Sequence, residues 1–130
     1  MSIDFNHTIV NCRDREQSAA FVAGILGLPV GEPLGPFLPV QTANEVSLDF
    51  VQSGEPDPPP QHYAFLVTES EFDAIFARIK DQRVPYAADY AYQEMGQINH
   101  NDGGRGLYFQ DPSRHSYEVI TRPYGPDTFS

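Results

Sequence analysis

The sequence predicts an α+β fold of two βαβββ modules, arranged as a cupped mixed sheet around a central cavity. Two observations predict it. The order of strand-like and helix-like segments in the first half recurs in the second half, and a proline-rich segment, 53–60 (SGEPDPPP), separates the halves. Consecutive prolines favour an extended linker, because proline cannot donate to a strand ladder. A chain of 130 residues fits one domain. Modules 1–52 and 61–130 are therefore expected to share a single domain.

The first module begins with the strand-like run 5–12 (FNHTIVNC). Residues 15–27 are predicted as a helix, with Asp14 as its N-cap and Gly27 as its stop. The helical spacing is carried by an apolar stripe formed by Ala19, Phe21, Val22, Ile25 and Leu26. Three extended segments follow, one opened by Leu28 and Pro29 and two strands, 37–43 and 46–52, joined by a turn at 43–45.

The second module repeats this order with a strand at 61–68 and a helix at 70–82, capped by Thr68 or Ser70. The apolar face of this helix is formed by Phe72, Ile75, Phe76 and Ile79. The remaining segments are an extended step at Val84 and Pro85, a long loop 86–104, and two strands, 105–111 and 116–122. A βαβββ sheet has one face covered by its helix, so two such sheets can pair their free faces around a shared cavity.

Polar side chains occupy corresponding strands of the two modules. His7 and His62 lie in the first strands, Glu118 lies in the last strand, and Asp49 is the counterpart of Glu118 in the first module. Each lies in a strand that also carries apolar residues, so alternation along the strand places the polar side chain on one face and its direct neighbours on the other. We therefore expect four potential metal ligands to converge on the cavity.

Two imidazoles and one carboxylate suit Fe(II), Mn(II), Zn(II), Co(II) or Ni(II), and leave positions free for water or substrate. A histidine in a strand is more often a packed or surface residue, but the equivalent placement across a repeat favours the metal interpretation. Asp49 is open as ligand, base or bystander. His100, in the loop, is a candidate general acid/base or substrate contact, with an ordinary polar loop residue as the alternative. Tyr90, Tyr92 and Tyr108 could line the cavity.

Residues 103–123 (GGRGLYFQDPSRHSYEVITRP) carry the most specific motif: an aromatic strand, an Asp-Pro turn and a His-x-x-Glu ending. The motif residues are Tyr108, Phe109, Asp111, Pro112, His115 and Glu118. The chain thereby resembles the vicinal oxygen chelate superfamily, which includes glyoxalase I, extradiol dioxygenases, fosfomycin-resistance thiol transferases and bleomycin-binding proteins. The resemblance implies that His7 and His62 complete the ligand set. It departs at Arg114, where the family usually has glycine. His115 is expected to point away from Glu118.

The resemblance implies a metal-dependent enzyme in which a divalent ion chelates oxygens of a small organic substrate. An isomerase or lyase, with Asp49 as base, and a ring-cleaving dioxygenase both remain open. The alternative is a non-catalytic drug-binding protein of the bleomycin-resistance type. Such members generally lack the metal ligands, which favours the enzyme. The resemblance also implies a homodimer, and the site can be built within one chain or across two.

The amino-acid composition limits the classes of molecule that the protein is expected to bind. The net charge of −10 argues against nucleic acid and anionic membranes, which require a basic surface. Only 8 Lys and Arg residues are present, with no evident cluster for a phosphonate. No apolar run reaches the roughly 18 residues of a membrane span, and the N-terminus lacks the pattern of a signal peptide. We therefore expect a cytoplasmic protein with a small-molecule substrate.

Overall fold

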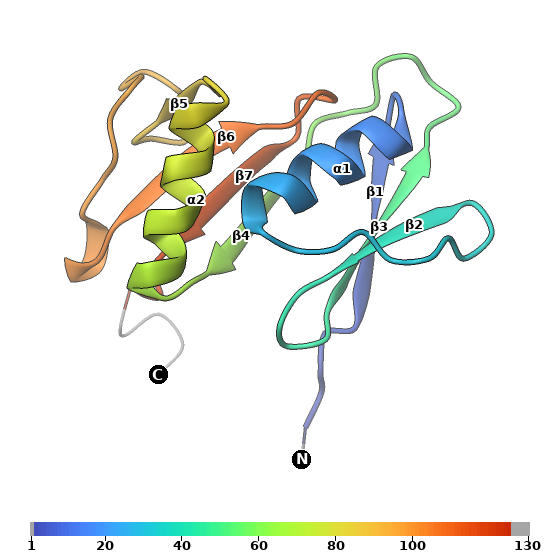
Figure 1. The fold of residues 1–130 in the computed structure, drawn as a ribbon, viewed down its shortest axis with the longest axis horizontal. Coiled ribbons are helices and arrows are strands. Elements are labelled where there is room, and N and C mark those ends of the chain that lie inside the picture. Colours follow the sequence, from blue (N-terminus) through green and yellow to red (C-terminus); the bar gives the residue numbers. More distant parts are fainter. Residues whose placement is uncertain (1, 126–130) are drawn as a thin grey trace. The chain divides into compact units, whose positions relative to one another are not determined.

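The computed structural model describes residues 2–125, and the chain divides into two compact units between Pro59 and Pro60. We call them unit 1 (1–59) and unit 2 (60–130) (Figure 1). The division falls inside the proline-rich segment 53–60. Each unit contains one α-helix and its own mixed sheet. The fold is α+β, as the sequence predicts.

Unit 1 contains one helix and three strands. They are β1 (His7–Cys12), α1 (Arg15–Leu26), β2 (Phe37–Gln41) and β3 (Ser47–Gln52). The strand order is β1-β3-β2, with β1 parallel and β2 antiparallel to β3. The extended segment predicted after the helix is reduced to a single antiparallel bridge between Val30 and Val40.

Unit 2 contains the longer version of the same arrangement. Its elements are β4 (His62–Leu66), α2 (Glu69–Asp81), β5 (Tyr86–Ala87), a short 3-10 helix η1 (Asn101–Gly103), β6 (Gly106–Gln110) and β7 (Ser116–Ile120). The strand order is β4-β7-β6-β5, with β4 parallel to β7 and the remaining neighbours antiparallel. The predicted strands and helices are confirmed to within a few residues at each end.

Both helices begin where local sequence chemistry predicts, and α1 also ends at its predicted stop. The Asp14 side chain accepts a hydrogen bond from the Gln17 N–H at 3.0 Å, and Gly27 ends α1 in the left-handed conformation with φ of 75°. Thr68, rather than Ser70, caps α2 and forms a capping box with Glu71. Such caps satisfy backbone N–H groups that have no partner within the helix.

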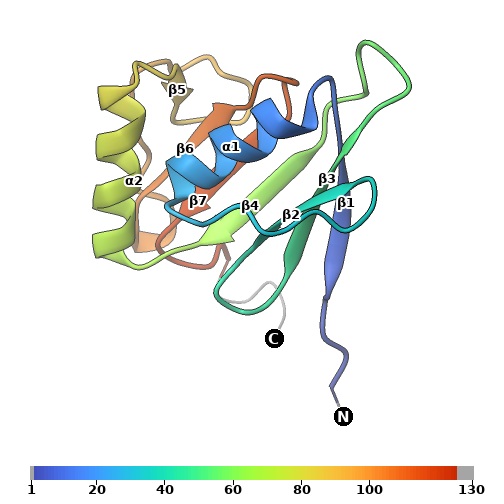
Figure 2. The same cartoon turned by 45° about the vertical axis from the view of Figure 1, so that its right-hand side comes forward.

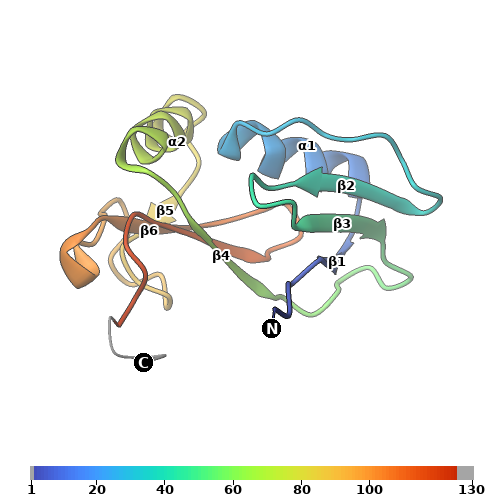
Figure 3. The ribbon, with the colours of Figure 1, turned by 90° about the horizontal axis from the view of Figure 1, so that it is seen from below.

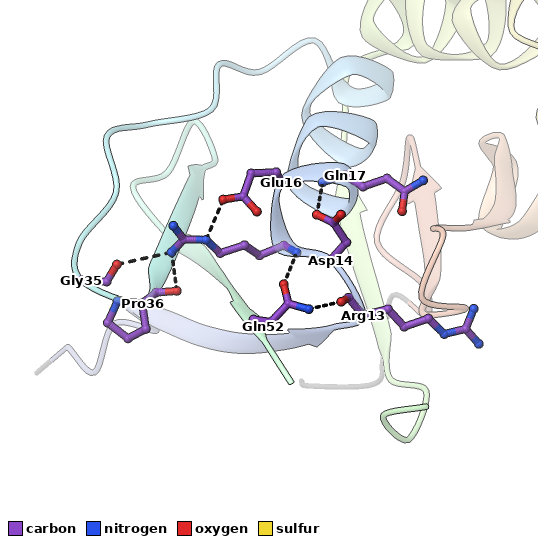
Figure 4. Close-up of polar contacts among 8 residues, drawn as sticks. Arg13, Asp14, Glu16, Gln17, Gly35, Pro36 and Gln52 are labelled. Atoms are coloured by element: carbon purple, nitrogen blue, oxygen red, sulfur yellow. Dashed lines mark hydrogen bonds and ion pairs between the residues drawn. The ribbon is translucent and has the colours of Figure 1, made fainter. Parts of the chain in front are cut away.

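Further polar contacts fasten the start of α1 to its surroundings (Figure 4). The Gln52 side chain accepts from the Arg15 N–H at 3.3 Å and donates to the Arg13 carbonyl. The Arg15 guanidinium donates to the carbonyls of Gly35 and Pro36, at 3.3 and 2.6 Å. The end of β3 and the loop before β2 are therefore both tied to the beginning of the helix.

In each unit the helix lies along one face of its own sheet (Figures 1 and 3). We call the opposite face of each sheet its open face. The strand residues that pack toward the helices are buried: Val10, Leu48 and Phe50 in unit 1, and Leu107, Phe109, Tyr117 and Val119 in unit 2. Burial of a large apolar side chain stabilises a fold by about 1.5–3 kcal/mol. These alternate positions therefore form the core.

The second helix lies over one face of the unit 2 sheet (Figure 2). Phe72, Ile75 and Ile79 are buried, as predicted. Phe76 is only half-buried, because its ring lies at the edge, 5.2 Å from the Tyr86 ring, with the Lys80 ammonium 4.2 Å from its centroid.

Among residues 2–125, no helix is both long enough and apolar enough to cross a lipid bilayer.

Candidate functional site

The registers of the two sheets place the predicted ligands at equivalent positions. The paired residues are His7–Ser47 and Ile9–Asp49 in unit 1, and His62–Ser116 and Ala64–Glu118 in unit 2. Each histidine therefore begins the first strand of its unit, opposite a serine. Each carboxylate follows that serine by two residues, on the same face of the strand. The internal repeat inferred from the sequence is thus a repeat of strand register.

In unit 2 the histidine and the carboxylate meet. His62 Nε2 lies 3.1 Å from Glu118 Oε1, and the side chains are 30% and 16% exposed. Glu118 lies between Tyr117 and Val119, which are wholly buried on the helix side. Because side chains alternate along a strand, the pair lies on the open face of the unit 2 sheet.

Tyrosine side chains surround this pair. The Tyr108 ring lies 5.9 Å from the His62 ring and nearly parallel to it, and the Tyr90 ring meets the same imidazole edge-on at 5.2 Å. The Tyr108 hydroxyl donates a hydrogen bond to Glu118. The ring centroids of Tyr92 and Tyr108 are 6.4 Å apart. We call Tyr90, Tyr92 and Tyr108 the tyrosine cluster.

The environment keeps two of these phenols protonated. Burial and, after it, the nearby Glu118 carboxylate, which disfavours a second negative charge, together raise the pKa of Tyr108 to about 12. Burial also raises the pKa of Tyr92, against the opposing effect of its hydrogen bond with Ser116. At neutral pH both therefore act as neutral hydrogen-bonding groups and not as phenolates.

The loop after β5 positions Tyr90 and Tyr92. The Asp89 carboxylate accepts from the N–H groups of Gln93 and Glu94, at 3.0 and 2.8 Å. These hydrogen bonds lower the pKa of Asp89, because they favour its charged form. The Tyr92 hydroxyl lies 2.8 Å from Ser116 Oγ. From the sequence we expected that these tyrosines could line the cavity. No local sequence pattern indicated that Tyr92 would form a hydrogen bond with Ser116.

The donor set of this pair fits a divalent metal ion. An imidazole nitrogen and a carboxylate oxygen each bind such ions at about 2.0–2.2 Å, so two donors on one ion lie about 3 Å apart. His62 Nε2 and Glu118 Oε1 have this separation. Catalytic sites usually have three protein ligands. Within residues 2–125, however, no group of three or more His, Cys, Asp or Glu side chains is placed to hold an ion.

The other predicted site residues have separate surroundings. His7 is exposed in unit 1, with Nδ1 2.7 Å from Asn6 Oδ1. Asp49 is half-buried and accepts a hydrogen bond from Ser47 Oγ at 2.7 Å. His100 is exposed just before η1, and no hydrogen bond or ion pair between described residues links it to the His62–Glu118 pair.

His115 has a structural role and is fully buried. Its Nδ1 accepts from the Gln61 N–H at 2.9 Å, and its own N–H donates to Asp111 at 2.9 Å. Its ring meets that of Tyr63, on the helix side of the sheet. Nearby Arg114 has φ of 67°, a left-handed conformation that glycine adopts more readily, which explains why glycine suits this position.

The two units thus repeat one α+β arrangement, and in unit 2 this arrangement brings an imidazole and a carboxylate together on the open face of the sheet. Residues 4–119 match the sequence profile of the Glyoxalase/Bleomycin resistance protein/Dioxygenase superfamily. The chain belongs to this superfamily, the vicinal oxygen chelate superfamily.

Solved structures agree with this assignment. The chain is 53% identical to the protein described as oxidase ChaP-H2, with a TM-score of 0.93, covering 96% of this chain and 98% of that one. Oxidase ChaP-H1 is 52% identical, with a TM-score of 0.92 and coverage of 95% and 99%. A lactoylglutathione lyase from Agrobacterium tumefaciens is 18% identical, with a TM-score of 0.67 and coverage of 90% and 92%. This last likeness shows the fold alone. The search of functionally curated sequences gave no match.

Proposed function

We propose that this protein is a metal-dependent oxidase of the dioxygenase type that acts on a small aromatic substrate. The observation that carries the proposal is the His62–Glu118 pair, 3.1 Å apart on an open sheet face and bordered by the tyrosine cluster. The two relatives above 50% identity are both described as oxidases, which supports oxidation over isomerisation.

His62 and Glu118 are the proposed ligands from unit 2, and His7 is the proposed third ligand. The support for His7 is its register, which matches that of His62. The homodimer that the family resemblance implies allows His7 to come from the same chain or from the second subunit. Of the divalent ions that suit this set, two histidines and one carboxylate favour Fe(II) when oxygen is a substrate. A bound ion would supply a Lewis acid for the substrate oxygens.

Tyrosine residues around the His62–Glu118 pair support the proposed metal and substrate binding. The Tyr108 hydroxyl donates to Glu118 and so fixes the orientation of that carboxylate, as partners of metal ligands commonly do. The exposed ring of Tyr90 offers an aromatic edge beside His62. Aromatic rings prefer offset or edge-to-face neighbours at about 4.5–7 Å, so this surface suits an aromatic substrate.

Two further residues are proposed for roles beside the metal. Asp49 is a candidate base, because its carboxylate is held by Ser47 and shares the register of Glu118. His100 is a candidate acid/base or substrate contact, because it is exposed in the loop before η1. Neither role is needed for metal binding. Asp49→Asn and His100→Gln should therefore lower kcat while leaving the metal content unchanged.

Metal analysis and oxygen uptake test the proposed function. Purified protein should retain a divalent metal, and Glu118→Ala should lose it. Asp81→Ala, which removes an exposed acid at the end of α2, is the matched control and should retain it. The metal-loaded protein should consume oxygen when supplied with catechol. Metal-free protein that binds bleomycin with unchanged affinity after Glu118→Ala would instead identify a non-catalytic binding protein.

A further inference from the structure

A surface cavity of about 500 Å³, open to solvent, lies on unit 2 beside the tyrosine cluster but is formed largely by other residues. Its lining consists of Pro85, Ala91, Tyr92, Met95, Gln110 and Asp111. Ligand cavities in proteins commonly measure about 300–1,000 Å³ and are mostly apolar with a few polar groups. The size and composition of this cavity therefore match those of a small-molecule site.

The loop that forms one wall is held at both ends. Ala87 and Met95 form an antiparallel bridge, and the Gly96 N–H donates to the Tyr86 carbonyl at 2.8 Å. The Ala88 N–H donates to the Glu94 carbonyl at 3.1 Å. Together with the contacts of the Asp89 carboxylate, these bonds define the shape of the loop. A site built on such a loop is largely formed before a ligand binds.

Tyr92 is common to the cavity and to the tyrosine cluster. It lines the cavity, while its hydroxyl lies 2.8 Å from Ser116 Oγ and its ring centroid lies 6.4 Å from that of Tyr108. Gln110, another lining residue, follows Tyr108 by two positions on β6 and therefore shares its face of the sheet. The cavity and the His62–Glu118 pair consequently lie on one face, with Tyr92 beside both.

The lining indicates the chemistry of an occupant. Pro85, Ala91 and Met95 present apolar atoms, and Tyr92 adds an aromatic ring. Gln110 is exposed and offers one amide for a hydrogen bond. Asp111 is engaged elsewhere, because it already accepts hydrogen bonds from Ser113, His115 and Tyr117.

The negative charge of the chain and of the cavity wall further restricts which ligands can bind in the cavity. A net charge of −10 and a buried carboxylate in the wall disfavour an anion. The Asp111 carboxylate is already held by three donors and is not free to pair with a cation, so the apolar wall atoms and the Tyr92 ring favour a neutral aromatic group with one hydrogen-bonding substituent.

We propose that this cavity is a subsite for a neutral aromatic part of the substrate, and that Tyr92 is a specificity-determining residue between it and the His62–Glu118 pair. The role as part of a substrate site rests on the proposed function, whereas the binding of a neutral aromatic group does not. A substrate with a second ring system would occupy both places. A single-ring substrate would use only the metal pair.

Equilibrium dialysis with 2-naphthol, a neutral two-ring phenol, tests this subsite. Ala91→Trp would fill the cavity and should weaken binding at least about tenfold, which corresponds to about 1.4 kcal/mol. Ala43→Trp, at an exposed turn of unit 1, is the matched control and should leave binding unchanged. Circular dichroism of each variant reports whether it is folded. Met95→Lys, at a residue 48% exposed, should weaken binding in the same way without a large folding cost.

The outcomes separate this inference from the proposed function. Saturable binding of 2-naphthol that survives Glu118→Ala but is weakened by both cavity variants supports the subsite, even if no metal or oxygen uptake is found. Binding that is lost in Glu118→Ala and unaffected by Ala91→Trp and Met95→Lys would place the probe at the metal pair and overturn the subsite. An absence of saturable binding to the wild-type protein would also overturn it.

Discussion

Units 1 and 2 share one strand register but arrange their polar residues differently. In unit 2, Glu118 reaches His62 at 3.1 Å. In unit 1, the equivalent Asp49 accepts from Ser47 at 2.7 Å, and His7 lies instead beside Asn6. A shared register is therefore not sufficient to form a histidine–carboxylate pair.

The neighbours of each carboxylate explain the difference. Ser47 and Ser116 are equivalent, but Ser116 is engaged by Tyr92, so it does not compete for Glu118 in the way that Ser47 holds Asp49. The residue opposite Glu118 on the next strand is Tyr108, whose hydroxyl donates to it, whereas the residue opposite Asp49 is a proline. Glutamate is also one methylene longer than aspartate. These differences support the choice of unit 2 for the two paired ligands of the proposed metal site.

The largest expected effect concerns the two carboxylates. Glu118→Ala should abolish retention of the metal, because it removes a proposed ligand. Asp49→Ala should change metal affinity by less than about tenfold. Loss of a residue that only orients a metal ligand usually lowers metal affinity by at least about tenfold, and no hydrogen bond or ion pair between described residues joins Asp49 to a proposed ligand. Titration of metal-free protein with Fe(II) or Zn(II) measures both. Equal losses in the two variants would contradict the difference drawn between the units.

The next comparison concerns the cores. Leu107 in β6 is fully buried, and Leu38 in β2, at the equivalent register, is 8% exposed. Buried leucine to alanine changes cost about 2–5 kcal/mol, depending on how far the surroundings can collapse. We expect Leu107→Ala to lie in this range and Leu38→Ala to cost less. Urea unfolding followed by circular dichroism provides the free energies of unfolding, and a larger cost at Leu38 would reverse the expected order.

A smaller effect is expected at Tyr108, whose counterpart in unit 1 is Pro39, a residue without a hydroxyl. Tyr108→Phe removes the hydrogen bond to Glu118 and should lower metal affinity by about tenfold. Tyr124→Phe, at an exposed position, is the control and should leave affinity unchanged. An unchanged affinity in Tyr108→Phe would show that the hydroxyl does not orient the carboxylate.

The same variant has a distinct pH dependence in the metal-free protein. The pKa of Tyr108 is raised to about 12, above the value of about 10 for an unfolded chain. The unfolded chain therefore releases this proton first, and stability should fall as pH rises from about 10 to about 12. Tyr108→Phe should remove this part of the loss. Unfolding measured at several alkaline pH values checks it, and the same slope in both proteins would argue against the shifted pKa.

The smallest comparison concerns the helix caps. Thr68→Ala removes the side-chain acceptor of the Glu71 N–H but keeps the bond from its own backbone N–H to the Glu71 carboxylate, whereas Asp14→Ala removes the side-chain cap of α1. Loss of an N-cap typically costs about 1 kcal/mol. We expect Thr68→Ala to cost somewhat less than Asp14→Ala in thermal unfolding, because half of its capping box remains. The reverse order would indicate that the hydrogen bonds of Arg15 and Gln52 hold the start of α1 without its cap.

Local physical chemistry made much of the fold predictable from the chain. The Asp14 and Thr68 caps, the Gly27 stop and the apolar spacing of both helices depend on residues within a few positions of one another. The strands follow from alternation, and the recurrence of the whole pattern predicted the equivalence of His7 with His62 and of Asp49 with Glu118.

Long-range placement decided the rest. The meeting of His62 with Glu118, the contact of Tyr92 with Ser116 and the cavity beside it join residues from different strands and loops. Asp49 accepts its hydrogen bond from Ser47 and does not pair with an imidazole. Which partner a carboxylate finds depends on the length of its side chain and on which neighbouring groups compete for its oxygens. Periodicity assigns a residue to a face of a strand. The partner it finds there depends on which other segments the tertiary fold brings to that face.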